Sequence, residues 1–124
     1  MNDIIKKYFT GLESADYQST IQLFAEDAIV KSPLYGTVSA QIFYKDLFKD
    51  TTQSKITLLN VFSNKNTPSV GAVHFRYDWT MKDGSQTFFE CVDIINLSAC
   101  RRIKELTIIY DTFGTRDAFM KLKA

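Results

Sequence analysis

Apolar residues in the N-terminal part of the chain recur at helical spacing. Asp16, in the start signal Ser14-Ala15-Asp16, and Ser39 stand just before the second and third of these patterns, where side chains cap helices. The three series are Ile4, Ile5, Tyr8, Phe9 and Leu12, then Tyr17, Ile21 and Phe24, then Ile42, Phe43 and Leu47. We therefore expect three short amphipathic helices before the chain changes character.

From Ser54 the apolar residues fall on alternate positions, which is typical of β-strands. Residues 56–62, 69–81, 86–97 and 103–112 show this pattern, and a brief strand is expected at 28–32, stopped by Pro33. The sequence Lys82-Asp83-Gly84-Ser85 favours a hairpin turn. Three helices followed by four long strands predict one α+β domain, residues 1–124, with a mostly antiparallel sheet packed on one face by the helices.

Alternation assigns a face to each strand residue. Asp93 shares a face with Cys91 and Ile95, so its carboxyl is expected in apolar surroundings that disfavour the ionised form. His74, the only histidine, falls on the face expected to meet solvent or a second subunit. In the strand before Asp93, the face expected to meet the helices carries Val73, Phe75, Tyr77, Trp79 and Met81.

Two parts of the sequence resemble a known family. Residues 7–12, Ala15-Asp16, 23–28 and Ser32-Pro33 resemble the amino terminus of ketosteroid isomerase. Residues 91–96, 102–106 and 109–111 are similar to the ending of SnoaL-type polyketide cyclases. The resemblance implies a curved, mostly antiparallel sheet wrapped around three N-terminal helices, the cone-shaped, cystatin-like roll of the nuclear-transport-factor-like superfamily.

The resemblance also implies a site. Tyr8 matches the family's oxyanion-hole tyrosine, and Asp93 matches its second oxyanion-hole group, a carboxylic acid, so these two are the candidate catalytic residues. A neutral carboxylic acid beside a tyrosine hydroxyl can stabilise an enolate oxygen. Ser32 stands where the isomerases carry their general-base aspartate, and a serine hydroxyl is a poor base near neutral pH.

Strand parity and the resemblance together predict an apolar ligand pocket. Its expected lining, besides Tyr8 and Asp93, is Ser32, Phe75, Tyr77, Trp79, Cys91, Leu106, Ile108 and Tyr110. The implied activity is that of an isomerase, cyclase or hydratase acting on a small apolar molecule without metal or organic cofactor. Two alternatives stay open: a noncatalytic carrier, and a dimerising interaction module with a vestigial pocket.

Charge and composition limit the kinds of partner that the protein is expected to bind. Fifteen Lys and Arg against fourteen Asp and Glu give a net charge of +1, without the basic excess that nucleic-acid binding needs. No stretch approaches the roughly 20 apolar residues that span a bilayer, and a cytoplasmic protein that does not bind membranes is expected. Cys91 and Cys100 lack partners at metal-ligand spacing and are interpreted as reduced thiols.

The apolar residues Phe88, Val92 and Ile94 fall on the strand face opposite Asp93. They predict a homodimer formed sheet to sheet.

Overall fold

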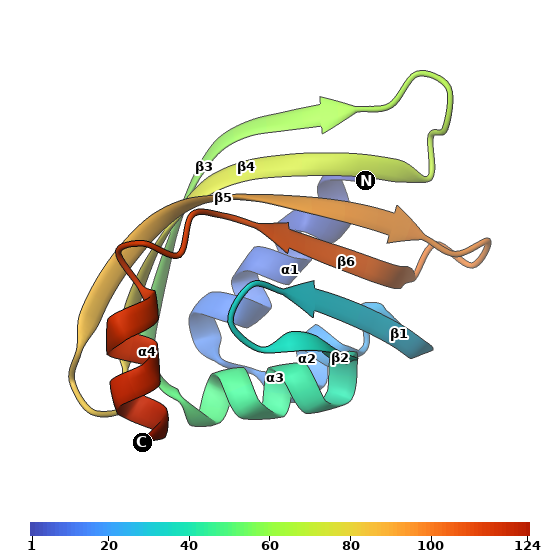
Figure 1. Ribbon diagram of the computed structural model, residues 1–124. Coiled ribbons are helices and arrows are strands. Elements are labelled where there is room, and N and C mark those ends of the chain that lie inside the picture. Colours follow the sequence, from blue (N-terminus) through green and yellow to red (C-terminus); the bar gives the residue numbers. More distant parts are fainter.

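Four helices and one six-stranded sheet make up the computed structural model, which describes residues 1–124 (Figure 1). The helices are α1 (Asn2–Ser14), α2 (Tyr17–Ile21), α3 (Ala40–Lys49) and α4 (Arg116–Lys123). The strands are β1 (Phe24–Ser32), β2 (Gly36–Ser39), β3 (Thr51–Ser63), β4 (Val70–Met81), β5 (Gln86–Leu97) and β6 (Ile103–Ile109). Their order in the sheet is β2-β1-β6-β5-β4-β3, with β1 and β6 parallel and every other pair antiparallel.

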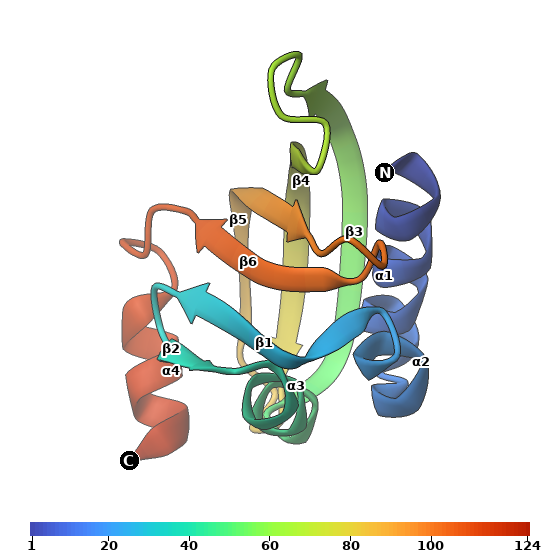
Figure 2. The same ribbon diagram turned by 90° about the vertical axis from the view of Figure 1, so that its right-hand side faces the viewer.

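The sheet is strongly curved, and α1, α2 and α3 lie inside the curve (Figures 1 and 2). The long strands β3, β4 and β5 arch over α1 (Figure 1), and α4 stands on the opposite side of the molecule from α1 (Figure 2). The predicted α+β fold, with a mostly antiparallel sheet around three N-terminal helices, is confirmed.

Alternation along β4 places its odd-numbered residues in the core, as predicted. Val73, Phe75, Tyr77, Trp79 and Met81 are all buried, whereas the even-numbered residues between them are at least partly exposed. Because β5 pairs with β4 in register, Cys91 lies beside Phe75 and Asp93 beside Val73 on the same inner face. The inner face of the sheet is therefore a continuous wall of large apolar side chains with one carboxyl in it.

Local signals in the sequence begin and end several elements. Asp16 caps α2 by accepting a hydrogen bond from the Ser19 N–H at 3.2 Å, and Ser39 caps α3 in the same way through the Ile42 N–H at 3.3 Å. Gly84 in the β4–β5 hairpin turn has φ of 88°, a conformation that favours glycine. These predictions are confirmed.

Other boundaries differ from the sequence-based expectation. Phe24 is not part of the second helix, which ends at Ile21; it begins β1, where it pairs with Ile103 of β6. Strand β1 is therefore longer than the brief strand expected at 28–32, and β2 and α4 were not predicted. The helical spacing of Phe24 was misleading because pairing with Ile103 of β6 places this residue in the sheet, and tertiary pairing overrides a local helical pattern.

Helices α1 and α2 touch at a glycine. A side-chain carbon placed on Gly11 would overlap the Oγ1 atom of Thr20, which is fully buried. The contact fixes α2 directly against α1, and with it the start of β1. None of the four helices is long and apolar enough to cross a membrane.

Candidate functional site

A cavity of about 50 Å³ lies between the inner face of the sheet and helices α1 and α3. Its wall is almost entirely apolar, and Asp93 is its one charged group. The lining residues are Tyr8, Leu12, Ser32, Tyr35, Phe43, Leu47, Phe75, Tyr77, Trp79, Phe89, Cys91, Asp93, Ile108 and Tyr110. Helices, strands and the β1–β2 turn all contribute, so the cavity is a product of the whole fold.

Asp93 is an acid without a basic partner. It is only 1% exposed, and its neighbours on the adjacent strands are Val73 and Ile108. Its side chain has one hydrogen bond, from the Cys91 thiol to Oδ1 at 3.2 Å. Burial raises the pKa of Asp93 to about 7, although the thiol hydrogen bond opposes the rise. Near neutral pH a substantial fraction of these carboxyls is therefore protonated and able to donate a hydrogen bond.

Tyr8 is bonded to a second tyrosine that the sequence analysis did not single out. Its hydroxyl lies 2.7 Å from that of Tyr44 on α3, and both side chains are buried. Burial raises the pKa of Tyr8 well above its usual value, and Tyr44 and the Asp93 carboxylate raise it further. If Tyr44 donates to Tyr8, the Tyr8 proton stays free for an acceptor in the cavity.

Ser32 lies at the cavity wall, but its hydroxyl oxygen is already in use. The backbone N–H groups of Leu34 and Tyr35 donate to Ser32 Oγ at 3.3 and 3.2 Å. Both lone pairs are thereby occupied, so what remains is the hydroxyl proton, which is available for donation. Ser32 can act as a donor to a ligand and is not placed to remove a proton from one.

Three near-parallel rings form one side of the cavity. Phe89 of β5 stacks on Tyr110 with ring centroids 3.8 Å apart, and on Tyr77 of β4 at 5.4 Å. The Tyr77 hydroxyl is engaged with Ser54 Oγ at 2.6 Å, on β3. Because the rings cover one another's faces, they present their edges to the cavity and form a rigid wall.

Comparison with solved structures identifies the architecture. An NTF2-like protein of unknown function from Exiguobacterium sp. 255-15 superposes with a TM-score of 0.74 at 17% identity, covering 87% of this chain and 98% of that one. SalBIII, an epoxide hydrolase/cyclase-like enzyme in pyran ring formation in the polyether salinomycin, gives 0.78 at 15% identity over 91% and 92%. Δ5-3-ketosteroid isomerase from Mycobacterium sp. gives 0.76 at 14% identity over 91% and 94%.

The chain has the NTF2-like fold. Identities this low establish the architecture alone, because one fold hosts many unrelated functions. No family model matches the sequence, and none of the curated proteins does so either.

Most residues expected at the site come together in the NTF2-like cone. Tyr8, Asp93, Ser32, Phe75, Tyr77, Trp79, Cys91, Ile108 and Tyr110 all line the cavity. Leu106 does not, and its expected place in the lining is wrong. It lies on the correct face of β6, but its neighbours Val30 and Ile95 are fully buried like itself, so the core fills that part of the cone.

Five lining residues were missed by the sequence analysis: Leu12, Tyr35, Phe43, Leu47 and Phe89. Phe89 could have been found, because it shares the parity of Cys91 and Asp93. Phe43 and Leu47 belonged to a recognised apolar helix face, but nothing in that pattern distinguishes core from cavity. Tyr35 lies in a turn, where no periodicity indicates where a side chain points.

Other titratable groups lie outside the cavity. His74 is on the outer face of the sheet, with Nε2 2.8 Å from Glu90 Oε1 and Nδ1 3.2 Å from Asn60 Nδ2. The exposed Asp111 accepts a hydrogen bond from the Phe113 N–H at 2.9 Å within a turn. No group of three or more His, Cys, Asp or Glu side chains is arranged to hold a metal ion.

Proposed function

We propose that the protein binds a small apolar molecule through a carbonyl group, with Tyr8 and Asp93 donating hydrogen bonds to the carbonyl oxygen. The observation that carries the proposal is Asp93: a carboxyl buried in an apolar cavity with a thiol as its one hydrogen-bond partner and a pKa raised to about 7. Burying such a group costs stability, and sites of this kind are enriched where ligands bind.

The chemistry follows from what a polarised carbonyl does. Hydrogen bonds to the oxygen stabilise negative charge that develops there when a neighbouring carbon loses a proton. An isomerase, a cyclase or a hydratase could each use such an enolate. Two of the structural neighbours are a cyclase-like enzyme and a ketosteroid isomerase, which agrees with this class of chemistry without defining a substrate.

A noncatalytic carrier is the second candidate, and one observation favours it. Asp93 is the only carboxyl lining the cavity, and Ser32 Oγ is occupied by two backbone N–H groups. A separate proton acceptor, which enolate chemistry ordinarily needs, is therefore missing from the wall. Turnover would require the ionised fraction of Asp93, or the ligand itself, to take the proton.

Binding can be tested with a matched pair of ligands, cyclohexanone and methylenecyclohexane, which differ in having C=O or C=CH₂. We expect the wild type to prefer the ketone, and Tyr8→Phe to reduce that preference by about fivefold, the value of one hydrogen bond of about 1 kcal/mol. Fluorescence of Trp79, the single tryptophan, reports occupancy because it lines the cavity. Equal binding of both ligands would refute the carbonyl site, and binding of neither would favour the interaction module.

Proton exchange separates enzyme from carrier. An enzyme that polarises the carbonyl should speed the exchange of the α-hydrogens of cyclohexanone for deuterium in D₂O, followed by NMR. The Asp93→Asn variant should lose this acceleration. A carrier would bind the ketone without changing the exchange rate.

We further propose that the protein is a homodimer that buries the outer face of the sheet. Exposed apolar side chains lie there on adjacent strands: Phe62 (54% exposed), Ile94 (37%), Ile109 (51%) and Phe88 (61%). Several polar groups among them are engaged within the chain: Arg76 forms an ion pair with Asp78, and His74 Nε2 lies 2.8 Å from Glu90 Oε1. These contacts lower the cost of burying the polar groups of this face, and Lys55, opposite Asp78 on β3, is a charged residue of the face without an ion pair.

A further inference from the structure

The cavity reaches the surface along one side. Nine of its lining residues are buried, and the five that are partly exposed are Ser32, Tyr35, Phe89, Ile108 and Tyr110. These five come from the end of β1, the β1–β2 turn, β5, β6 and the residue after β6. A ligand must therefore pass between the β1–β2 turn and the outer ends of the neighbouring strands.

The small volume of the cavity makes this entrance important. A volume of about 50 Å³ is a third of the roughly 150 Å³ apolar cavity known to hold benzene. A molecule containing even one ring cannot fit until a wall residue moves. The residue that moves then decides which ligands enter.

Tyr35 lies in the β1–β2 turn with its ring packed on Phe43 and Phe119, so only side-chain contacts oppose movement of its side chain. Phe89 and Ile108 belong to hydrogen-bonded strands, and Tyr110 is stacked on Phe89. Ser32 is paired with Gly36 in the β1–β2 ladder. The side chain of Tyr35 projects from the turn and is held by side-chain contacts rather than by strand pairing.

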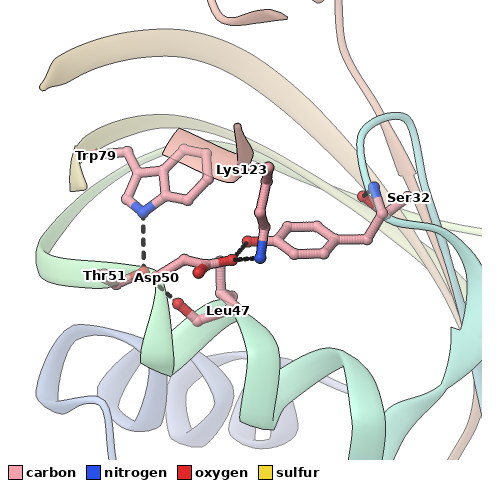
Figure 3. A network of polar contacts seen from close by, with 7 residues as sticks. Ser32, Leu47, Asp50, Thr51, Trp79 and Lys123 are labelled. Carbon is pink, nitrogen blue, oxygen red and sulfur yellow. Dashed lines mark hydrogen bonds and ion pairs between the residues drawn. The ribbon is translucent and has the colours of Figure 1, made fainter. Parts of the chain in front are cut away.

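Those contacts come from α3 and α4. The Tyr35 hydroxyl donates a hydrogen bond to Asp50 Oδ2 at 2.8 Å, and Lys123 of α4 forms an ion pair with the same oxygen. Figure 3 shows Lys123 reaching from α4 to Asp50 at the end of α3. The Lys123 ammonium also lies 5.6 Å from the centre of the Tyr35 ring, and Phe119 packs against that ring at 5.0 Å.

Helix α4 is itself fastened only by side chains. No backbone hydrogen bond joins it to the sheet, and Thr115 at its start bonds to Thr87 through the two hydroxyls at 3.0 Å. Phe119 packs on Trp79 as well as Tyr35, so α4 covers two residues of the cavity wall from outside. Releasing Lys123 would loosen α4 and Tyr35 together.

We propose that Tyr35 is the gate that determines which ligands enter the cavity, and that Asp50 and Lys123 are positioning residues that hold the gate shut. The closed position depends on the ion pair between Lys123, whose side chain is 40% exposed, and Asp50, whose side chain is 9% exposed. Because the pair is partly exposed to solvent, added salt weakens it. The proposed function supplies the ligand that passes through the gate, but opening itself can be measured without any ligand.

Acrylamide quenching of Trp79 tests opening directly, because Trp79 is the only tryptophan and is 3% exposed behind the gate. Lys123→Met removes the charge and keeps an apolar stem. We expect the quenching constant to rise about fivefold, the factor that corresponds to about 1 kcal/mol for a partly exposed ion pair. Lys121→Met, two positions earlier on α4 and in no ion pair, should behave as the wild type, and Lys123→Arg should restore shielding. Identical quenching in all four proteins would overturn the gate.

Stopped-flow binding of cyclohexanone gives the second readout. Weakening the contacts that hold Tyr35, by Lys123→Met or Tyr35→Phe, should raise the association rate constant and lower Kd by similar factors, because a ring fits the cavity only when the wall has moved and these contacts oppose that movement. A loss of affinity with unchanged association would show that Tyr35 is an ordinary contact residue and refute the proposal. Should cyclohexanone not bind at all, the proposed function fails, and the quenching experiment still decides the gate.

Discussion

Replacing Asp93 by Asn should change how the stability of the protein depends on pH. In the unfolded chain the carboxyl has its ordinary pKa of 3.8, whereas burial raises the folded-state pKa to about 7. Below pH 3.8 the group is mostly protonated in both states and adds nothing to the pH dependence of stability. As pH rises toward 7 the unfolded state ionises first, so stability falls, and above pH 7 the loss is complete. The two pKa values correspond to a loss of about 4 kcal/mol at 1.36 kcal/mol per pKa unit.

Urea unfolding at several pH values between 4 and 8 measures this effect. The free energy of unfolding of Asp93→Asn should gain about 4 kcal/mol relative to the wild type between pH 4 and pH 8, because Asn stays neutral. Taking the difference between the two free energies of unfolding at each pH cancels the contributions of all other titrating groups. Asp78→Asn is a matched control on the outer face: Arg76 lowers the pKa of Asp78 below its ordinary 3.8, so the contribution of this carboxyl changes mainly below pH 4, and its variant should show little change relative to the wild type between pH 4 and pH 8. A constant difference between wild type and Asp93→Asn across this range would refute the raised pKa and the hydrogen-bond donor built on it.

Two further changes test packing and assembly. Ile94→Lys places a charge on the exposed outer face of the sheet. It should leave the fold intact and shift the mass measured by light scattering from that of a dimer to that of a monomer. A wild-type protein that is already monomeric at micromolar concentration would contradict the dimer. Gly11→Ala should destabilise the fold by about 1–3 kcal/mol in thermal or urea unfolding, because the added methyl group meets the buried Thr20 hydroxyl. Gly114→Ala is the control: no atom lies within 4 Å of the added methyl group, so stability should change little.

The sequence predicted the parts of the fold that depend on local patterns. The period-two alternation of β4 and β5 placed Asp93 and Trp79 on the inner face, and the caps Asp16 and Ser39 marked two helix starts. It did not predict β2, which has only four residues, or α4, which buries the side chain of Phe119 alone among its residues. Neither offers enough periodic positions to be distinguished from a loop or a charged tail.

Strand parity and the family resemblance predicted part of the site. Tyr8 and Asp93 do share one cavity, but the hydrogen bond between the Tyr8 and Tyr44 hydroxyls joins residues 36 positions apart. Tyr35 could not be assigned from sequence because its environment is made by Asp50 and Lys123, which lie on two different helix ends. Contacts of this kind depend on tertiary packing, which no local pattern records.

The parallel pairing of β1 with β6 has a consequence for how the chain is made. Phe24 pairs with Ile103, and Lys31 with Thr107, so two neighbouring strands, the second and third in the sheet order, are separated by most of the sequence. Contacts of such long range are slow to form because a large loop must close first. While the chain is being synthesised, β1 must therefore wait for β6, and Ile108 and Tyr110 complete the cavity wall only at that point. A ribosome-bound chain that ends before β6 should thus bind no ligand, and ligand binding would report completion of the last strand.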